Sequence, residues 1–177
     1  DDEQPGNANL DKIPTLRPAF SKDGTVTAAN ASAISDGAAA LVLMKESEAK
    51  KRGLAPIAKI VAASSHAHEP EYFTTAPVPA MKKALDKAGW SVDEVELWEV
   101  NEAFAVVPMI AMKEMGIPHD KLNVNGGACA MGHPIGASGA RVIVTLLAAM
   151  EDRGAKKGMA SLCIGGGEGI AMALERY

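Results

Sequence analysis

Residues 125–141 read NGGACAMGHPIGASGAR, and this stretch places a single histidine, His133, in a loop crowded with glycines. Glycine permits positive φ angles and lets the backbone approach a neighbour closely. Pro134 restricts its own backbone and that of His133, so the loop predicts a histidine held in one position. The apolar residues over 137–153 recur at helical spacing. The stretch therefore predicts a functional histidine immediately before the longest helix of the chain.

Short apolar runs and helical patterns alternate on both sides of this stretch. We expect strands at 39–44, 57–63, 94–98, 122–124, 159–164 and 170–174, and helices at 47–52, 78–88, 103–115 and 137–153. This alternation, with short connections, predicts an α/β domain in layers, with a mixed, mostly parallel sheet and helices on both faces. Only a glycine-rich turn joins the last two strands, so we expect those two to be antiparallel.

The bulk properties indicate an ordinary globular domain. The chain has 177 residues, of which 47% are hydrophobic and 23% charged, and its formal net charge is −4. This charge argues against a surface for nucleic acid or an anionic membrane, and no apolar run is long enough to span a bilayer. The two cysteines form no CxxC pair. We expect a cytoplasmic location and no metal site, and the first residue, Asp1, leads us to expect a piece of a longer protein.

Two further motifs carry polar or reactive side chains. NEAFA at 101–105 begins with Asn101, which could cap a helix or orient a substrate oxygen. CIGGG at 163–167 begins with Cys163, which could be a small buried hydrophobe or an acid or base at the end of a strand. Cys129 is the competing thiol, but it lies where ordinary packing would accept Ala or Ile. The remaining histidines, His66, His68 and His119, lack comparable surroundings, and we expect no role for them.

Taken in order, the three motifs resemble those of the thiolase family, enzymes that make or break a carbon–carbon bond between acyl groups carried on coenzyme A. The resemblance runs nearly end to end, from KDGTVTAANAS at 22–32 to the turn at 163–167, and corresponds to the family's C-terminal half. It implies a polar lead-in over 1–24 and a thiolase C-terminal domain over 25–177. The N-terminal domain, with its nucleophilic cysteine, is expected to be absent.

The resemblance also implies catalytic roles. His133 activates the nucleophile and helps to bind the thioester oxygen, and Asn101 holds the water that completes this first oxyanion hole. Cys163 removes or returns the α-proton, and the backbone N–H of Gly165 contributes to a second oxyanion hole. Because the nucleophile belongs to the other half, we expect no turnover by this chain alone.

The substrate-binding residues follow from the same resemblance. Ser32 is expected to touch the pantetheine arm, and the channel is expected to be lined by Ala31, Phe104 and Phe73. Phe73 stands where short-chain thiolases often have methionine, which favours a reshaped acyl pocket. Alanines also replace two glycines common in this part of the family, at 29 and 33. Lys12 and Arg17 are weak candidates for the phosphates of coenzyme A.

The implied activity is that of an acetyl-CoA C-acetyltransferase in fatty acid metabolism: Claisen condensation of two acetyl-CoA to acetoacetyl-CoA and CoA, or the reverse thiolysis. Coenzyme A thioesters are substrates, and no further cofactor is expected. The implied partners are an N-terminal thiolase half and a second copy, in a homodimer or homotetramer, with neither nucleic acid nor membrane. Alternatives are a degradative 3-ketoacyl-CoA thiolase and a non-catalytic CoA-binding or assembly module.

Overall fold

A four-stranded mixed sheet forms the centre of the protein in a computed structural model that describes residues 3–177. The strands are β1 (Ala58–Ala67), β2 (Leu97–Val100), β3 (Lys157–Ile164) and β4 (Glu168–Arg176), in the order β1-β4-β3-β2. β4 runs antiparallel to both β1 and β3, and only β2 and β3 are parallel. The sheet is therefore mixed, as expected, but the expectation that it is mostly parallel is wrong. The turn after β3 returns the chain between β3 and β1 instead of leading into a crossover helix.

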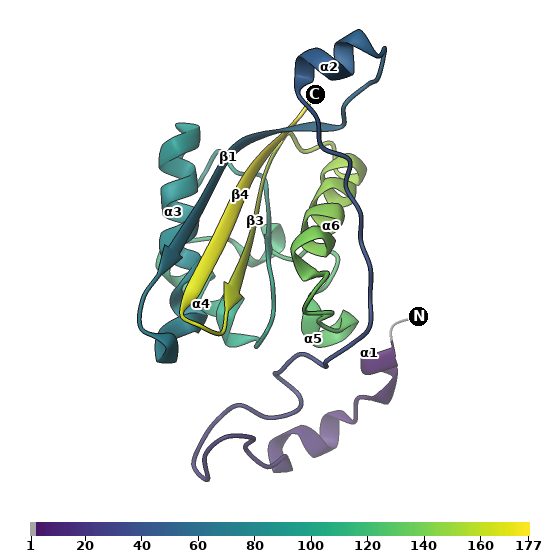
Figure 1. The fold of residues 1–177 in the computed structure, drawn as a ribbon. Helices are drawn as coiled ribbons and strands as arrows, with labels where there is room; N and C mark the ends of the chain where they lie inside the picture. The colour runs from purple at the N-terminus through teal and green to yellow at the C-terminus, as the bar shows by residue number, and fades with distance from the viewer. Residues whose placement is uncertain (1–2) are drawn as a thin grey trace.

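Helices cover both faces of this sheet (Figure 1). On one face lie α3 (Pro77–Ala88) and α4 (Val106–Met115), and on the other lies α6 (Ser138–Asp152). Each face has its own apolar core: Met81, Trp98 and Val107 pack together on the first, and Val142, Leu146 and Met150 on the second. Since these side chains are almost completely removed from water, their burial is the main force that holds the three layers together.

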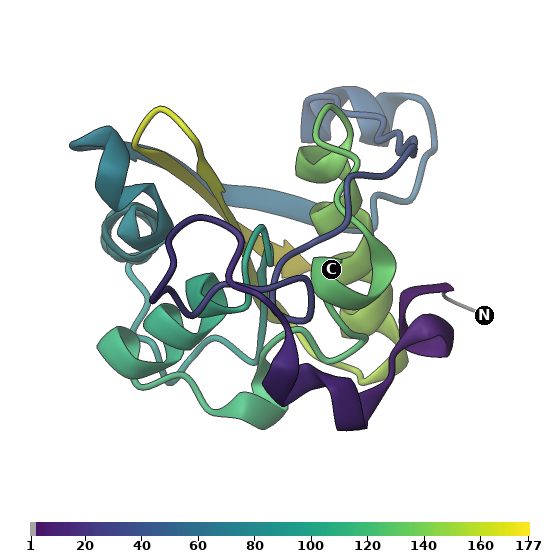
Figure 2. The same cartoon turned by 90° about the horizontal axis from the view of Figure 1, so that it is seen from below.

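The residues before β1 form an arm, residues 3–57, which lies outside these layers. It contains α1 (Glu3–Asn7), the 3-10 helix η1 (Leu10–Thr15) and α2 (Glu46–Lys51), joined by extended chain. Seen from below, the first part of the arm, coloured purple, lies across the near end of the sheet domain (Figure 2), and the arm then runs past α6 to α2 at the opposite end (Figure 1). The strand expected at 39–44 is not formed: Val42 is 88% exposed and Leu43 66%, and no β-ladder includes them.

Smaller elements complete the chain: η2 (Pro70–Thr75), η3 (His119–Lys121) and α5 (Ala128–Met131). The strand expected at 122–124 is reduced to a single bridge between Leu122 and Trp98. The helix expected from 103 begins only at Val106, and helices α3 and α4 end before glycines, as expected. Over residues 3–177, no helix is both long and apolar enough to cross a membrane.

Candidate active site

His133 and Asn101 lie in contact, although 32 residues separate them in the chain. The side-chain Nδ2 of Asn101 is 3.2 Å from Nε2 of His133. Asn101 directly follows β2, where its own N–H donates to the carbonyl of Ser161 in β3. The end of the parallel strand pair therefore carries the amide to the histidine loop.

The loop that carries His133 is anchored on its other side. Nδ1 of His133 lies 2.6 Å from the hydroxyl of Ser138, at the start of α6, and that hydroxyl donates to the carbonyl of Pro134 at 3.0 Å. The backbone N–H of His133 donates to the carbonyl of Ala33 in the arm at 2.8 Å. Burial and the nearby Arg141 hold the pKa of His133 below its usual value, which favours the neutral imidazole.

A buried ion pair lies behind Asn101. Arg141, on α6, donates from Nη2 to Oδ1 of Asn101 at 3.0 Å, and its Nη1 is 3.8 Å from Oε2 of Glu99 on β2. Glu99 is only 2% exposed. Its burial raises the pKa of its carboxyl to about 7, although Arg141 acts in the opposite direction. The amide between Arg141 and His133 is therefore held from both sides.

Glu102, next to Asn101, binds the histidine loop near its start. Its carboxylate accepts a hydrogen bond from the backbone N–H of Cys129 at 3.0 Å. A Cβ atom on Gly127 would collide with the same carboxylate, so a larger residue there would force the Glu102 side chain away from Cys129. Consecutive residues thus hold the loop near its start and at His133.

Cys163 lies at the same end of the sheet as Asn101. It is the penultimate residue of β3, the strand parallel to β2, and so lies beside the point where β2 ends. Its side chain is 8% exposed and belongs to the apolar core that also contacts Phe73 and Phe104. Burial raises the pKa of its thiol to about 11, so the group rests protonated at neutral pH.

The competing thiol has a different environment. Cys129, on α5, is half-buried, and desolvation together with the adjacent Glu102 raises its pKa to about 12.

Gly165 lies two residues after Cys163 in the turn before β4, and the space beside its α-carbon is open. Within the described chain, the N–H of Gly165 has no backbone acceptor. A free N–H beside Cys163 is what an oxyanion-binding group requires.

The four residues expected to bind substrate come together. Ser32 donates from both its N–H and its hydroxyl to the carbonyl of Ala103, at 3.2 and 3.0 Å, and Ala31 forms a β-bridge with Phe104. Phe73 meets Phe104 edge to face, with ring centres 6.1 Å apart. These contacts attach the arm to the NEAFA segment. Lys12 and Arg17 lie exposed in the arm.

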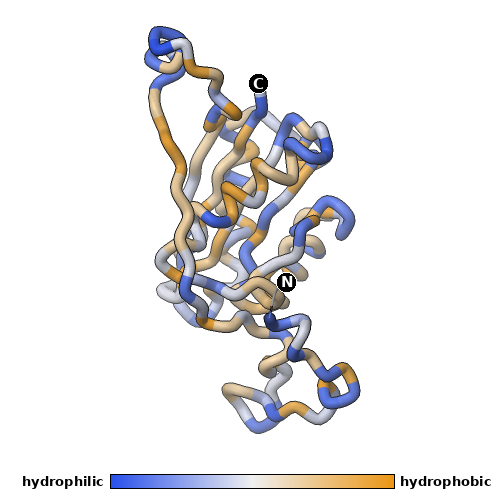
Figure 3. The backbone as a smooth tube through the Cα atoms, turned by 90° about the vertical axis from the view of Figure 1, so that its right-hand side faces the viewer, coloured by the Kyte–Doolittle hydropathy of each residue, from blue (hydrophilic) through white to orange (hydrophobic). Residues whose placement is uncertain are grey.

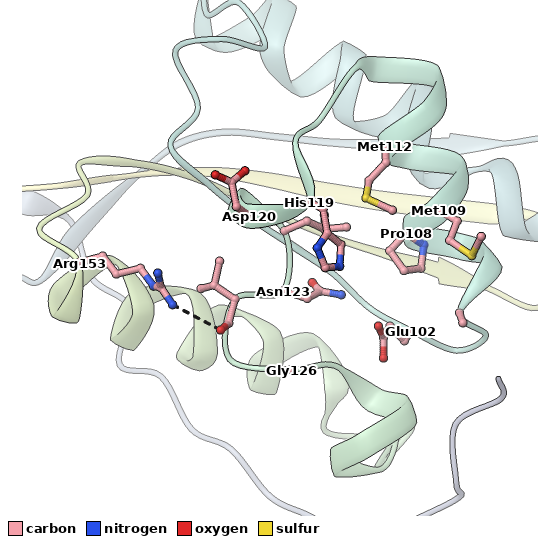
Figure 4. Close-up of a pocket in the computed structure, with 12 residues that line it drawn as sticks. Glu102, Pro108, Met109, Met112, His119, Asp120, Asn123, Gly126 and Arg153 are labelled. Carbon is pink, nitrogen blue, oxygen red and sulfur yellow. Dashed lines mark hydrogen bonds between the residues drawn. The ribbon is translucent and has the colours of Figure 1, made fainter. Parts of the chain in front are cut away.

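A separate pocket of about 520 Å³ lies beside α4 and η3 (Figure 4). Glu102, His119, Asn123 and Arg153 contribute polar groups, and Met109 and Met112 line its apolar side. Neither His133 nor Cys163 lines it. His66, the penultimate residue of β1, and His68, which follows that strand, lie side by side, with Nε2 of the first 3.3 Å from Nδ1 of the second. These two histidines are also remote in the chain from the loop of His133.

The sequence correctly placed His133 and Asn101 together but missed much of what holds them. Asn101 does not cap a helix, because α4 begins five residues later and the amide is engaged by Arg141 and His133. The unpredicted members are Glu99, Glu102, Ser138 and Arg141. Glu99 offered the clearest signal, since it is a charged residue in a short strand that is otherwise apolar.

Sequence comparison finds two family profiles along the chain. "Thiolase, C-terminal domain" matches residues 54–176, and "Thiolase, N-terminal domain" matches residues 1–47. The chain is 57% identical over 169 residues to an acetyl-CoA acetyltransferase of Rhizobium meliloti, covering 96% of this chain and 43% of that protein. The chain thus spans less than half the length of this curated relative.

Solved structures give the same relationship in three dimensions. The Bacillus anthracis acetyl-CoA acetyltransferase aligns with a TM-score of 0.95 and 46% identity, over 99% of this chain and 45% of that one. Human mitochondrial 3-ketoacyl-CoA thiolase in complex with CoA aligns with a TM-score of 0.87 and 38% identity, over 97% and 43%. Both the sheet domain and the arm therefore have counterparts in these proteins.

Proposed function

The chain belongs to the thiolase family, and from this premise we propose that it supplies the acid–base half of an acetyl-CoA C-acetyltransferase. The observation that carries the proposal is the contact of His133 with Asn101 at the end of the sheet where Cys163 also lies. A CoA-binding or assembly module needs neither a positioned imidazole nor a thiol at this place.

In the proposed condensation, His133 takes the proton of a nucleophilic thiol, and that thiol accepts an acetyl group as CoA leaves as a thiolate, which takes the proton of Cys163 to become free CoA. The α-carbon of a second acetyl-CoA then loses a proton to the Cys163 thiolate and attacks the acyl thioester. This forms acetoacetyl-CoA and releases the nucleophile, which takes back its proton from His133. His133 and the water held by Asn101 stabilise the negative charge that develops on one thioester oxygen, and the N–H of Gly165 contributes to the second oxyanion hole. We assign substrate contacts to Ser32, Ala31, Phe104 and Phe73.

We further propose that the nucleophile comes from an N-terminal thiolase domain, of which residues 1–47 represent only part. Neither Cys129 nor Cys163 is a good nucleophile at neutral pH, because both thiols have raised pKa values. The exposed apolar residues of the arm, among them Val42 and Leu43, support a further protein surface that covers them. A second copy of the complete protein would give the homo-oligomer expected of the family.

The two cysteines provide a matched test in an active protein. In a chimera, this chain replaces the corresponding C-terminal part of the Rhizobium meliloti acetyl-CoA acetyltransferase, and thiolysis of acetoacetyl-CoA is measured. We expect Cys163→Ala to reduce kcat by about 10²–10⁴-fold, the usual contribution of general acid–base catalysis. Cys129→Ala should retain most of the activity. Equal effects of the two substitutions would contradict the role of Cys163.

Phe73 is the observation that favours a second candidate function, that of a 3-ketoacyl-CoA thiolase for longer acyl chains. Its ring packs against Phe104, which is bridged to the arm at Ala31, so its size affects the shape of this channel. We expect the chimera to prefer acetoacetyl-CoA and Phe73→Met to change the ratio of kcat/KM between four-carbon and longer 3-ketoacyl-CoA substrates. A preference for long chains in the unsubstituted chimera would favour the second candidate.

A further inference from the structure

The hydrogen bonds around His133 form a continuous chain whose donors and acceptors can be assigned. It begins at Arg141, passes through the amide of Asn101 and the imidazole of His133, and ends at the hydroxyl of Ser138. Asn101 and Ser138 are buried. Unpaired donors or acceptors at such positions are costly, so the chain must be consistent at every link.

The direction of the chain is set at Arg141. A guanidinium donates hydrogen bonds and accepts none, so the atom of Asn101 that faces it at 3.0 Å must be the carbonyl oxygen. The NH₂ group of Asn101 then faces Nε2 of His133 at 3.2 Å. Because the amide donates there, Nε2 must accept and carries no proton in the resting state.

The contacts on the opposite side of the ring agree with the same assignment. The hydroxyl of Ser138 has one proton, which it donates to the carbonyl of Pro134. It therefore accepts from Nδ1 of His133 across the 2.6 Å contact. The other neutral tautomer would direct the Nε2 proton at the NH₂ of Asn101 and leave two donors facing each other.

We infer that Arg141, paired with Glu99, is a positioning residue that fixes the amide of Asn101 and thereby holds His133 as the Nδ1–H tautomer with a free lone pair on Nε2. The assignment of the tautomer rests on hydrogen bonds alone. Its catalytic consequence rests on the proposed function: a lone pair on Nε2 is what a base needs to accept a thiol proton. Once protonated, Nε2 becomes a hydrogen-bond donor and can stabilise an anionic oxygen of the substrate.

Glu99 lies beside Arg141 and offers it an opposite charge. The two groups are 3.8 Å apart in a buried position, and among the described residues neither Nε of Arg141 nor Oε1 of Glu99 has a hydrogen-bond partner. The guanidinium donates from Nη2 to Asn101 at 3.0 Å and from Nη1 to the hydroxyl of Thr145 at 3.4 Å, and its contact with Glu99 is electrostatic, without a hydrogen bond.

The direct test is the tautomer of His133, measured by ¹⁵N–¹H correlation spectra of the imidazole in the 177-residue chain. We expect the unsubstituted chain to show a protonated Nδ1 and an unprotonated Nε2 at neutral pH. In Asn101→Asp, the carboxylate can only accept, so Nε2 should become protonated. In Arg141→Met, the amide is free to rotate, and a mixture of tautomers with a higher pKa of His133 is expected.

Arg176→Met is the matched control, because Arg176 is another partly buried arginine, whose Nη1 donates to the carbonyl of Met150 and not to Asn101. It should leave the tautomer unchanged. Arg141→Lys keeps the charge and replaces Arg141→Met if the latter does not fold; it should restore part of the single-tautomer signal. A resting Nε2–H in the unsubstituted chain, or a tautomer unaffected by substitution of Arg141, would overturn the inference.

Kinetics of the chimera separate this inference from the proposed function. Arg141→Met should lower kcat for thiolysis more than it raises KM, because it disturbs the base and not the substrate contacts. An inactive chimera whose His133 still shows the expected tautomer would contradict the proposed function and leave the positioning role intact. An active chimera with unchanged kcat in Arg141→Met would contradict the catalytic consequence of the positioning.

Discussion

The sheet domain, residues 58–176, and the arm, residues 3–57, differ in how far their apolar side chains are buried. The sheet domain packs its large apolar residues between layers, and Met81, Leu146 and Met159 are fully buried. Within the described residues of the arm, only Ala49 is buried, and apolar side chains lie exposed along the extended segment (Figure 3). The sheet domain has its own core, whereas the arm has the apolar sequence of a structural element but lacks a partner for it.

The catalytic candidates follow this division. His133, Asn101 and Cys163 belong to the sheet domain, but the arm touches their surroundings: the carbonyl of Ala33 accepts from His133, and Ser32 bonds to Ala103. The comparison shows that a folded core positions the acid–base groups. Part of the surface around these groups, in contrast, is formed by the arm, which has almost no core of its own.

Matched leucines in the two regions give the largest expected difference in stability. Leu146→Ala opens a cavity between α6 and the sheet, where the side chain is completely buried, and should cost about 4 kcal/mol. Leu43→Ala, at a side chain that is 66% exposed, should change the free energy of unfolding by less than about 0.5 kcal/mol. Urea unfolding of the 177-residue chain measures the change in the free energy of unfolding for each variant. Comparable losses would show that Leu43 is packed in a core of the arm, contrary to its exposure in this structure.

The buried Glu99 predicts a pH dependence for the sheet domain. Its folded pKa, about 7, lies above the ordinary value of 4.5 for a glutamate, so the folded state binds the proton more tightly than the unfolded state. The contribution to stability is present below the unfolded pKa and is lost as pH rises toward 7, by up to about 3 kcal/mol.

Glu99→Gln isolates this effect from the histidines, which titrate in the same range. The unsubstituted chain should lose stability relative to Glu99→Gln between about pH 4.5 and 7, measured by urea unfolding at several pH values. A constant difference between the two proteins over this range would mean that Arg141 fully compensates the buried carboxylate.

Two glycines sharpen the comparison at the histidine loop. Gly127→Ala forces a methyl group against the carboxylate of Glu102 and should destabilise the chain by about 2 kcal/mol. Gly139→Ala meets no atom within 4 Å of the new Cβ and lies in α6, so it should be neutral or slightly stabilising. Thermal unfolding of both variants tests whether Glu102 holds the histidine loop. Equal shifts in Tm for the two variants would refute this role.

The smallest expected effect lies in the arm. Glu46 and Lys50 form an ion pair one turn apart on α2, at 2.6 Å, and both side chains are largely exposed. Glu46→Gln should leave the stability of the chain nearly unchanged, because water and salt screen an exposed ion pair. A larger loss in urea unfolding would indicate that α2 supports the sheet domain more strongly than its contacts suggest.

Much of the fold was predictable because helices α3, α4 and α6 and strands β1, β3 and β4 have clear local patterns. The pairing of strands was not: β4 inserts between β1 and β3, which no local pattern specifies, and this makes most pairings antiparallel. Residues 39–44 have the composition of a strand, but a strand needs a neighbour. Composition alone cannot say whether that neighbour is present.

The site was predictable in part for the same reason. The glycine-rich loop identified His133 and the order of the motifs identified Asn101 and Cys163, since these signals lie within short segments. Arg141, in contrast, contacts residues that lie 40 or more positions away in the sequence, namely Asn101 and Glu99. Such contacts become visible only when β2 and α6 are packed together.

The most direct measurement of the central claim is thiolysis of acetoacetyl-CoA by the 177-residue chain alone and by the chimera that supplies an N-terminal thiolase domain. The account predicts no turnover by the chain alone, turnover by the chimera, and its loss in the chimera with His133→Asn. Turnover by the chain alone, or a folded chimera that is inactive toward 3-ketoacyl-CoA substrates, would contradict it.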